Sequence, residues 1–169
     1  SCDALTSSIA CMVVNVNYAM SFNTPVGAGN TSPVNSSRNM FQHVTSFNQD
    51  IGDWDTSAVT SMIGMFNSAT AFNQPIGDWD VSAVTDLSDM FEDAISFNQD
   101  IGDWNTSAAI YMSDMFEDAT SFDPDISEWN VSAATYLSYL FKDATSFNPD
   151  IHTWNRTPAR SKPPLFTTH

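Results

Sequence analysis

Carboxylates are the most abundant groups in this sequence that could do chemistry, and they recur in short clusters. Asp50, Asp53 and Asp55 lie close together, and Asp100 and Asp103 repeat part of the cluster. Carboxylate oxygens are the ligands that Ca²⁺ prefers, but this spacing matches no known calcium loop. Other copies of the cluster lose a carboxylate. We therefore expect a solvated acidic face and no metal site.

The residues that usually serve as nucleophiles, bases and zinc ligands are few. His43, His152 and His169 are scattered, and no nucleophile–base pairing, zinc spacing or phosphate-binding loop is present. Cys2 and Cys11 are close enough for a local disulfide in a secreted protein, and two free buried thiols are the alternative. The sequence thus predicts neither an enzyme nor a cofactor.

Asparagines that begin an Asn-x-Ser/Thr sequence are the third chemical feature, because this is the acceptor motif for N-linked glycans. The candidates are Asn30, Asn35, Asn105, Asn130 and Asn155. All except Asn35 occupy one position of a repeat, directly after its tryptophan position, and elsewhere aspartate fills that position. Asparagine or aspartate there also suits a capping role, so glycosylation and capping both remain open.

The charge of the chain limits its partners. It has 20 acidic and 5 basic residues, a net charge of −15. Such a surface repels phosphate backbones and anionic lipid, so we expect no nucleic acid and no membrane surface as partner. No apolar run approaches the roughly 20 residues of a membrane span. The first residue is Ser1 rather than methionine, which suggests a secreted chain whose signal peptide has been removed.

Large apolar residues recur every 25 residues, and this periodicity indicates the architecture. Four columns keep the spacing: Phe41, Phe66, Phe91, Phe116 and Phe141; Phe47, Phe72, Phe97, Phe122 and Phe147; Ile51, Ile76, Ile101, Ile126 and Ile151; and Trp54, Trp79, Trp104, Trp129 and Trp154. A unit of this size cannot bury its own apolar face, so neighbouring units must stack and share one continuous core.

Each repeat is predicted to have a strand half and a helix half. Phe47 and Ile51 alternate as in a short strand, and Val59, Met62 and Phe66 belong to the apolar stripe of a short helix. We therefore expect an α/β solenoid, leucine-rich-repeat-like, of about six 25-residue coils, each with a short parallel strand and a short helical turn. An asparagine ladder should satisfy backbone groups in successive coils; its members are Asn48, Asn73, Asn98, Asp123 and Asn148.

The repeat defines one predicted domain, residues 1–155, with regular repeats over 39–155. Residues 1–38 are diverged repeat, because Phe22–Gly27 lies one period before Phe47–Gly52. Residues 156–169 form a proline-rich basic tail.

The repeat consensus Met-Phe-x-x-Ala-x-Ser-Phe-Asn-Gln-Asp-Ile-x-x-Trp-Asp-x-Ser-x-Val-Thr-x-Met, followed around residues 65–90, resembles the BspA-like leucine-rich-repeat surface protein family. The resemblance covers residues 39–155 well and the N-terminal block weakly. It implies a leucine-rich-repeat-like solenoid on an extracellular or cell-surface protein, a link to adhesion, and no catalytic residue.

The two ends of the repeat array suggest how the protein acts, because a solenoid exposes its core at an uncapped end. Neither end has a polar cap, and the N-terminal block is in phase to follow the last coil of another copy. We expect head-to-tail stacking into an extracellular, glycosylated filament, a homopolymer. The interface candidates are Ser7, Ile9, Met12, Val13, Val16, Phe147, Ile151, Trp154, Arg156, Arg160, Lys162, Leu165 and Phe166. The alternative is a cell-surface adhesion protein that binds through its sheet face.

Overall fold

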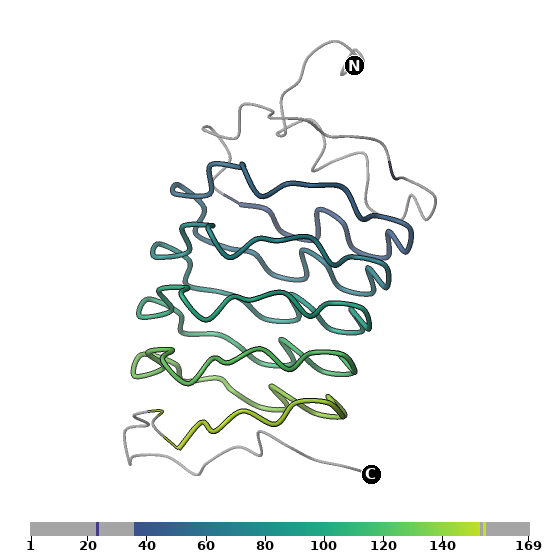
Figure 1. Cartoon of the computed structure of the whole chain (residues 1–169). Coiled ribbons are helices and arrows are strands. Elements are labelled where there is room, and N and C mark those ends of the chain that lie inside the picture. Colours follow the sequence, from purple (N-terminus) through teal and green to yellow (C-terminus); the bar gives the residue numbers. More distant parts are fainter. Residues whose placement is uncertain (1–22, 24–35, 153, 155–169) are drawn as a thin grey trace.

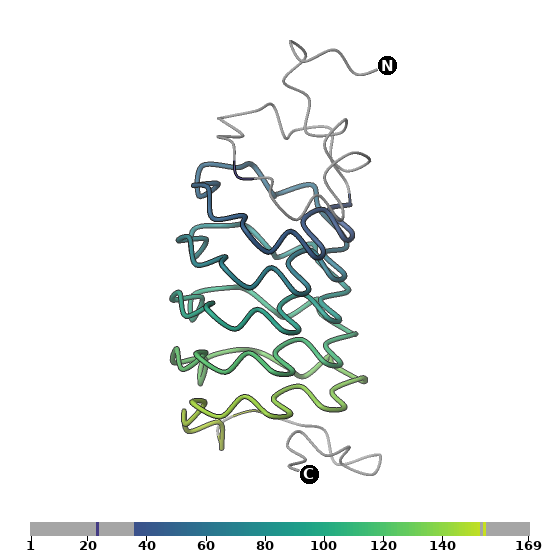
Figure 2. The same cartoon turned by 90° about the vertical axis from the view of Figure 1, so that its right-hand side faces the viewer.

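The computed structural model describes residues 23, 36–152 and 154, and the continuous part of this range is a stack of similar coils (Figures 1 and 2). Residues one repeat apart lie above one another: Ser36, Ser61, Asp86, Tyr111 and Tyr136 are joined in sequence by parallel single-residue bridges. The 25-residue spacing of the sequence is therefore the length of one coil.

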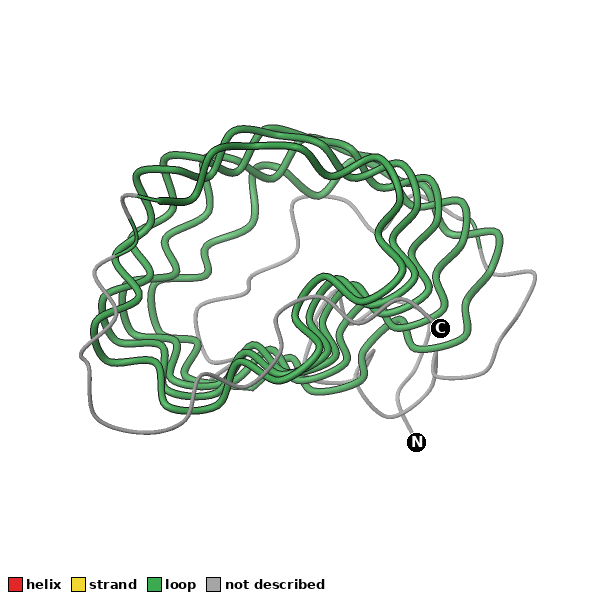
Figure 3. Ribbon diagram, turned by 90° about the horizontal axis from the view of Figure 1, so that it is seen from below, coloured by secondary structure: helices red, strands yellow, loops and turns green. Residues whose placement is uncertain are grey.

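The coils contain neither of the two elements that the sequence suggested. Among the described residues there is no helix, and the only strand pairing is the set of isolated bridges. Figure 3, which looks along the stack, shows every described coil as turns and loops. The prediction of an α/β solenoid, with a strand and a helical turn in each coil, is wrong. The chain stacks in 25-residue coils without forming either element.

Left-handed backbone conformations explain why the predicted helix half does not form. Gly64 has φ 57° and Ser68 has φ 56°, so the stretch that begins at Val59 is interrupted twice within a few residues. An α-helix needs consecutive right-handed residues, and L-residues enter the left-handed region singly. The same two positions are left-handed in every described coil: Asn39, Gly64, Asp89, Asp114 and Tyr139, and His43, Ser68, Asp93, Asp118 and Asp143.

The backbone amides of this stretch alternate between two kinds of partner. Met65 donates to the Met62 carbonyl within its own turn (3.2 Å), whereas Phe66 donates to the Met90 carbonyl of the next coil (2.9 Å). Four amides in each coil make such bonds to the next coil, and this pattern holds at all four coil interfaces from Ser37 to Lys142. Hydrogen bonds between coils thus replace the hydrogen bonds along a helix, because buried backbone N–H and C=O groups need partners.

The predicted strand half is joined to its neighbours by hydrogen bonds that involve side chains, and not by backbone-to-backbone hydrogen bonds. The Asn73 amide donates to the side-chain oxygen of Asn48 (2.9 Å), and the Asn98 amide donates to that of Asn73 (2.9 Å). The predicted asparagine ladder is confirmed, and it begins at Asn23, which accepts from the Asn48 amide (3.0 Å). Because amide oxygens take the place of backbone carbonyls, no β-ladder forms here.

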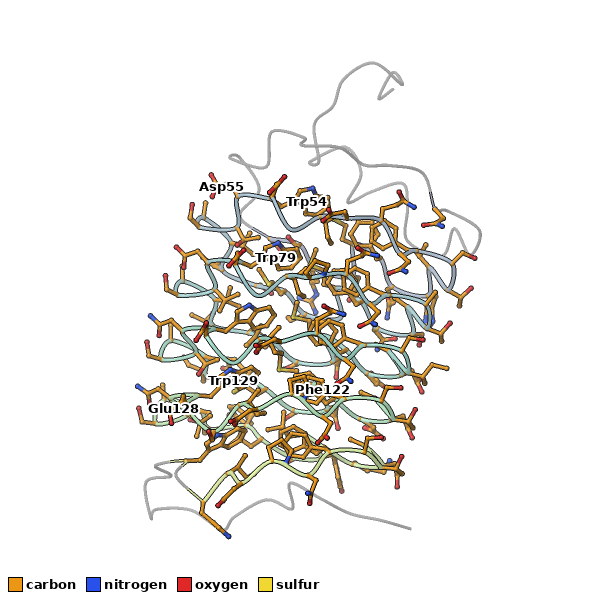
Figure 4. The ribbon with its side chains drawn as sticks, viewed as in Figure 1. Trp54, Asp55, Trp79, Phe122, Glu128 and Trp129 are labelled. Atoms are coloured by element: carbon orange, nitrogen blue, oxygen red, sulfur yellow. The ribbon has the colours of Figure 1, made fainter. Side chains whose placement is uncertain are left out.

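The core consists of the predicted aromatic and aliphatic columns. Phe66 is fully buried, and its ring centroid lies 5.6 Å from that of Phe41 in the preceding coil and 5.6 Å from that of Phe91 in the following coil. The tryptophans also lie above one another (Figure 4), and the indole N–H of Trp79 donates to the Ile51 carbonyl (3.1 Å). Burial of these columns supplies the main stabilisation, because each buried aromatic removes a large apolar area from water.

Tyr139 is a local weak point of this fold. It has φ 57° at a position that asparagine, glycine or aspartate fills in the other coils, and bulky residues are disfavoured there. We predict that Tyr139→Asn raises the free energy of unfolding by roughly 0.5–1 kcal/mol, measured by urea denaturation. Tyr136→Asn, outside the left-handed columns, should give no gain. A destabilised Tyr139→Asn would mean that the contact of the ring with Lys142 (5.8 Å from ring centroid to Nζ) outweighs the backbone strain.

Candidate functional site

The C-terminal end of the described stack has backbone donors left over from the repeating pattern. The amides of Met112, Asp114 and Asp118 donate to the next coil, but their equivalents one coil later have no next described coil. Over residues 36–152, the amides of Leu137, Tyr139 and Asp143 have no hydrogen-bond partner. These donors form an edge at which another coil would complete the pattern.

The same end also has hydrogen-bond acceptors of the two kinds that, in the inner coils, accept hydrogen bonds from the following coil. The side-chain oxygen of Asp123 accepts from the Asn148 amide (2.9 Å), but that of Asn148 has no donor among the described residues. Likewise the Ile126 carbonyl accepts from the indole N–H of Trp154 in the following coil (3.0 Å). No described coil follows Ile151, so its carbonyl has no indole donor among the described residues. Donors and acceptors are therefore both available at this end.

Apolar side chains are also less buried at this end than elsewhere in their columns. Phe122 and Ile126 are 0 % exposed, whereas their equivalents Phe147 and Ile151 are only half-buried. Phe147 and Ile151 are two of the predicted interface candidates, and both lie at this end of the described stack. Trp154, by contrast, is buried in its own coil and is part of the core. The C-terminal end of the described stack thus combines partly buried apolar side chains with hydrogen-bonding groups.

A ladder of half-buried acidic residues runs along the side of the stack, and the sequence analysis missed it. The side-chain amide of Asn67 donates to the carboxylate of Glu92 in the following coil (2.5 Å), and Lys142 forms an ion pair with Glu117 in the preceding coil. Asp114 lies beside Glu117, so carboxylates gather between these two contacts. Four consecutive coils therefore place carboxyl, amide and ammonium groups in a single column.

Burial and the repulsion of neighbouring carboxylates raise the pKa values of Glu92 and Asp114. Burial, followed by the charges of Asp89 and Glu117, raises the pKa of Glu92 to about 7. Burial and a hydrogen bond with Glu117 raise the pKa of Asp114 to about 6. These carboxyl groups therefore exchange protons in the neutral to mildly acidic range.

Exposed aromatic and aliphatic side chains form a second surface feature, on the side of the last coils. Tyr111 (41 % exposed) and Tyr136 (51 % exposed) stack with 4.8 Å between their ring centroids. Ile110 and Tyr139 are exposed as well. We call the stacked pair Tyr111 and Tyr136 the tyrosine patch. Exposed apolar patches of this kind often mark binding surfaces.

Two of the predicted glycosylation positions are described, and both are exposed. Asn105 accepts through Oδ1 from the Ser107 amide (3.2 Å), and Asn130 accepts in the same way from the Ser132 amide (3.1 Å). The predicted capping is therefore present, but the asparagine caps a turn and not a helix.

Several predicted site residues lie outside the described residues. They are Cys2, Ser7, Ile9, Cys11, Met12, Val13, Val16, Asn30, Asn35, Asn155, Arg156, Arg160, Lys162, Leu165 and Phe166.

The described stack has neither a metal-binding cluster nor a membrane-spanning helix. In residues 36–152, no group of three or more histidine, cysteine, aspartate or glutamate side chains could hold a metal ion. The described part of the chain also has no helix long and apolar enough to cross a membrane. An open hollow at the last coil is lined by Asp123, Asp125, Ser127, Asn148, Pro149 and Asp150.

Comparison with known proteins gives one match. No curated protein and no solved structure matches the chain. The family described as "Mycoplasma protein of unknown function, DUF285" matches over residues 4–94 and again over residues 74–168. The two matches overlap and together cover residues 4–168, nearly the whole chain. The chain therefore belongs to this family of repeat proteins.

Proposed function

We propose that the protein is a structural protomer whose stacks join head to tail into an extracellular filament. One observation carries the proposal: at the C-terminal end of the described stack, the amides of Leu137, Tyr139 and Asp143 have no hydrogen-bond partner among the described residues, and Ile151 is only half-buried. Inner coils use the equivalent groups to bind the next coil. The proposed role is structural and not catalytic.

The sequence supports a second copy of the chain as the binding partner of this end. The N-terminal block keeps the repeat pattern in phase, and it contributes Ser7, Ile9, Met12, Val13 and Val16 to the proposed interface. Contact between two different ends of one molecule is heterologous, and it propagates when the rotation does not close a ring. Arg156, Arg160 and Lys162 would face the acidic body of the neighbour, with Leu165 and Phe166 as apolar anchors.

The extracellular location rests on the resemblance to BspA-like surface proteins. Those proteins carry comparable repeats outside the cell, and the acidic surface of this chain suits a soluble or surface-exposed repeat array. The extracellular location and the relationship to BspA-like surface proteins are both part of the proposal.

Assembly of the full chain tests the filament. We expect negative-stain microscopy to show long thin fibres for the 169-residue chain. Ile151→Asp should abolish fibres, because it places a charge in the apolar part of the C-terminal end. Val13→Asp should also abolish fibres, because it places a charge in the N-terminal block that is proposed to bind the C-terminal end. Truncation after Trp154 tests the contribution of the basic tail.

Mixing the two point variants distinguishes head-to-tail contact from other modes. Ile151→Asp retains a functional N-terminal end and Val13→Asp a functional C-terminal end, so the mixture should form dimers and nothing longer. Light scattering measures this directly. Glu128→Gln on the outer edge of a coil is the control and should still form fibres (Figure 4). A wild-type chain that stays monomeric at all concentrations, with residues 155–169 present, would refute the proposal.

A ligand-binding surface protein is the second candidate, and the tyrosine patch favours it. Such a protein would not bind through a sheet face, because the described coils form only isolated β-bridges and no sheet. Loss of cell adhesion in Tyr111→Ala with Tyr136→Ala, with fibres unchanged, would support this candidate.

A further inference from the structure

One outward-facing position recurs in four described coils and caps a turn in each. It follows the buried tryptophan, and its members are Asp55, Asp80, Asn105 and Asn130. All four are exposed, and each accepts through Oδ1 from the amide of the serine two residues later, at 3.0–3.2 Å. Figure 4 shows Asp55 at the outer edge of its coil, away from the tryptophan column.

The turn uses only the oxygen of this side chain. Asp55 and Asp80 have no amide nitrogen, yet they form the same hydrogen bond as Asn105 and Asn130. Among the described residues, the Nδ2 atoms of Asn105 and Asn130 make no hydrogen bond. In those two coils the amide nitrogen is therefore exposed and is not needed for folding.

The residues around this position complete an acceptor motif that points outward. The serine that the turn requires is also the third residue of Asn-x-Ser. The middle residues Thr106 (1 % exposed) and Val131 (2 % exposed) point into the coil, so the first and third residues lie outside. A bulky group on Nδ2 would contact neither the core nor the bonds between coils.

We propose that Asn105 and Asn130 are N-glycosylated, which forms a column of glycans along one edge of the stack. The donor is an oligosaccharide linked to lipid through a diphosphate, supplied by the secreting cell. Nδ2 attacks C1 of the first sugar and the new N–C1 bond replaces the C1–O bond. The lipid diphosphate leaves with the electron pair, and the nitrogen releases one proton to a base.

The glycans would be closely spaced, which sets their effect on assembly. Trp104 and Trp129 directly precede the two sites, and their ring centroids are 6.3 Å apart. The two adjacent glycans would therefore shield the edge of the coils that carry Asn105 and Asn130 and leave the described C-terminal end of the stack uncovered. This edge would be closed to side-by-side association, while end-to-end contact would remain open.

The test is the mass of the full chain secreted from a eukaryotic host, before and after peptide-N-glycosidase, which leaves aspartate at each occupied site. We expect glycopeptides that contain Asn105 and Asn130. Asn105→Asp and Asn130→Asp should each remove one glycan without lowering the unfolding midpoint, because Asp55 and Asp80 already form this turn. Asp80→Asn should add a glycan, because it creates Asn-Val-Ser at the same position.

Two outcomes would refute the inference. A secreted chain with unmodified Asn105 and Asn130 would leave turn capping as their only role, even if other sequons were occupied. Failure of Asp80→Asn to gain a glycan would mean that this edge does not accept one. The readout is the mass of a single chain, so it is independent of whether stacks join into filaments.

Discussion

Replacing Phe91 with alanine is expected to lower the free energy of unfolding by about 3–5 kcal/mol. Phe91 is 0 % exposed and lies at the centre of the described stack. Its ring centroid is 5.6 Å from that of Phe66, 5.5 Å from Phe116 and 4.0 Å from Phe97. Alanine would leave a cavity between coils that are held apart by their other rings. Urea denaturation followed by tryptophan fluorescence measures the loss.

Two comparisons separate this effect from a general loss of apolar area. Phe147→Ala should cost much less in dilute, unassembled protein, because Phe147 is only half-buried, whereas Phe91 is fully buried. Phe91→Leu should cost less than Phe91→Ala because it fills part of the cavity. An equal cost for Phe91→Ala and Phe147→Ala would contradict a core built by stacking, in which each coil contacts only its neighbours.

The stacking of the repeats could be predicted because it depends on a signal that does not require secondary structure. Phe, Ile and Trp at fixed 25-residue intervals must share a core, whatever conformation the chain takes between them. The asparagine ladder was predictable for a similar reason. An amide such as Asn73 repeated beside a core column has both a donor and an acceptor to offer to adjacent coils.

The conformation inside a coil could not be predicted from the apolar pattern alone. Val59, Met62 and Phe66 have helical spacing, but turns with left-handed residues between them also bring apolar side chains to one side. The signal that distinguishes the two lies in polar residues. Gly64 and Ser68, and the Asp, Asn and His residues at equivalent positions, include the residue types that tolerate positive φ. Their recurrence four residues apart in every coil argues against a helix.

The candidate site was partly predictable for the same reason. The phase of the repeat identified the C-terminal end, and Phe147 and Ile151 are where that phase places them. The direction of the hydrogen bonds that leave donors there depends on the left-handed turns, so it could not be read from the sequence. The acidic ladder of Glu92 and Asp114 also depends on how the turns bring successive coils together.

The second large effect is an unusual dependence of stability on pH: the protein should become less stable as the pH rises from about 4.5 to about 7. Glu92 titrates at 4.5 in the unfolded chain and at about 7 in the folded one. Within that window the folded state binds more protons than the unfolded state, so stability falls with rising pH. Asp114, with a pKa of about 6, acts in the same direction. Thermal unfolding across this range measures the change in midpoint.

Other carboxyl groups act in the opposite direction at lower pH, which predicts a stability maximum. Hydrogen bonds from Ser57 and Ser82 lower the pKa values of Asp55 and Asp80 below 3.8. Their contribution is present above 3.8 and is lost as the pH falls through the folded values. The described coils should therefore be most stable in mildly acidic solution, between the range of these turn carboxylates and that of the ladder.

The variant Glu92→Gln tests whether Glu92 causes the fall in stability between pH 4.5 and 7. Gln42 and Asn67 already place an amide at this repeat position, so the substitution suits the site. We expect the variant to be more stable than the wild type at pH 8 and to lose much of the decline between 4.5 and 7. Glu128→Gln makes the same charge change on the exposed edge and should keep the wild-type profile. If both variants shifted the profile equally, net charge would be the cause and the half-buried position of Glu92 would not, since long-range repulsion does not depend on burial.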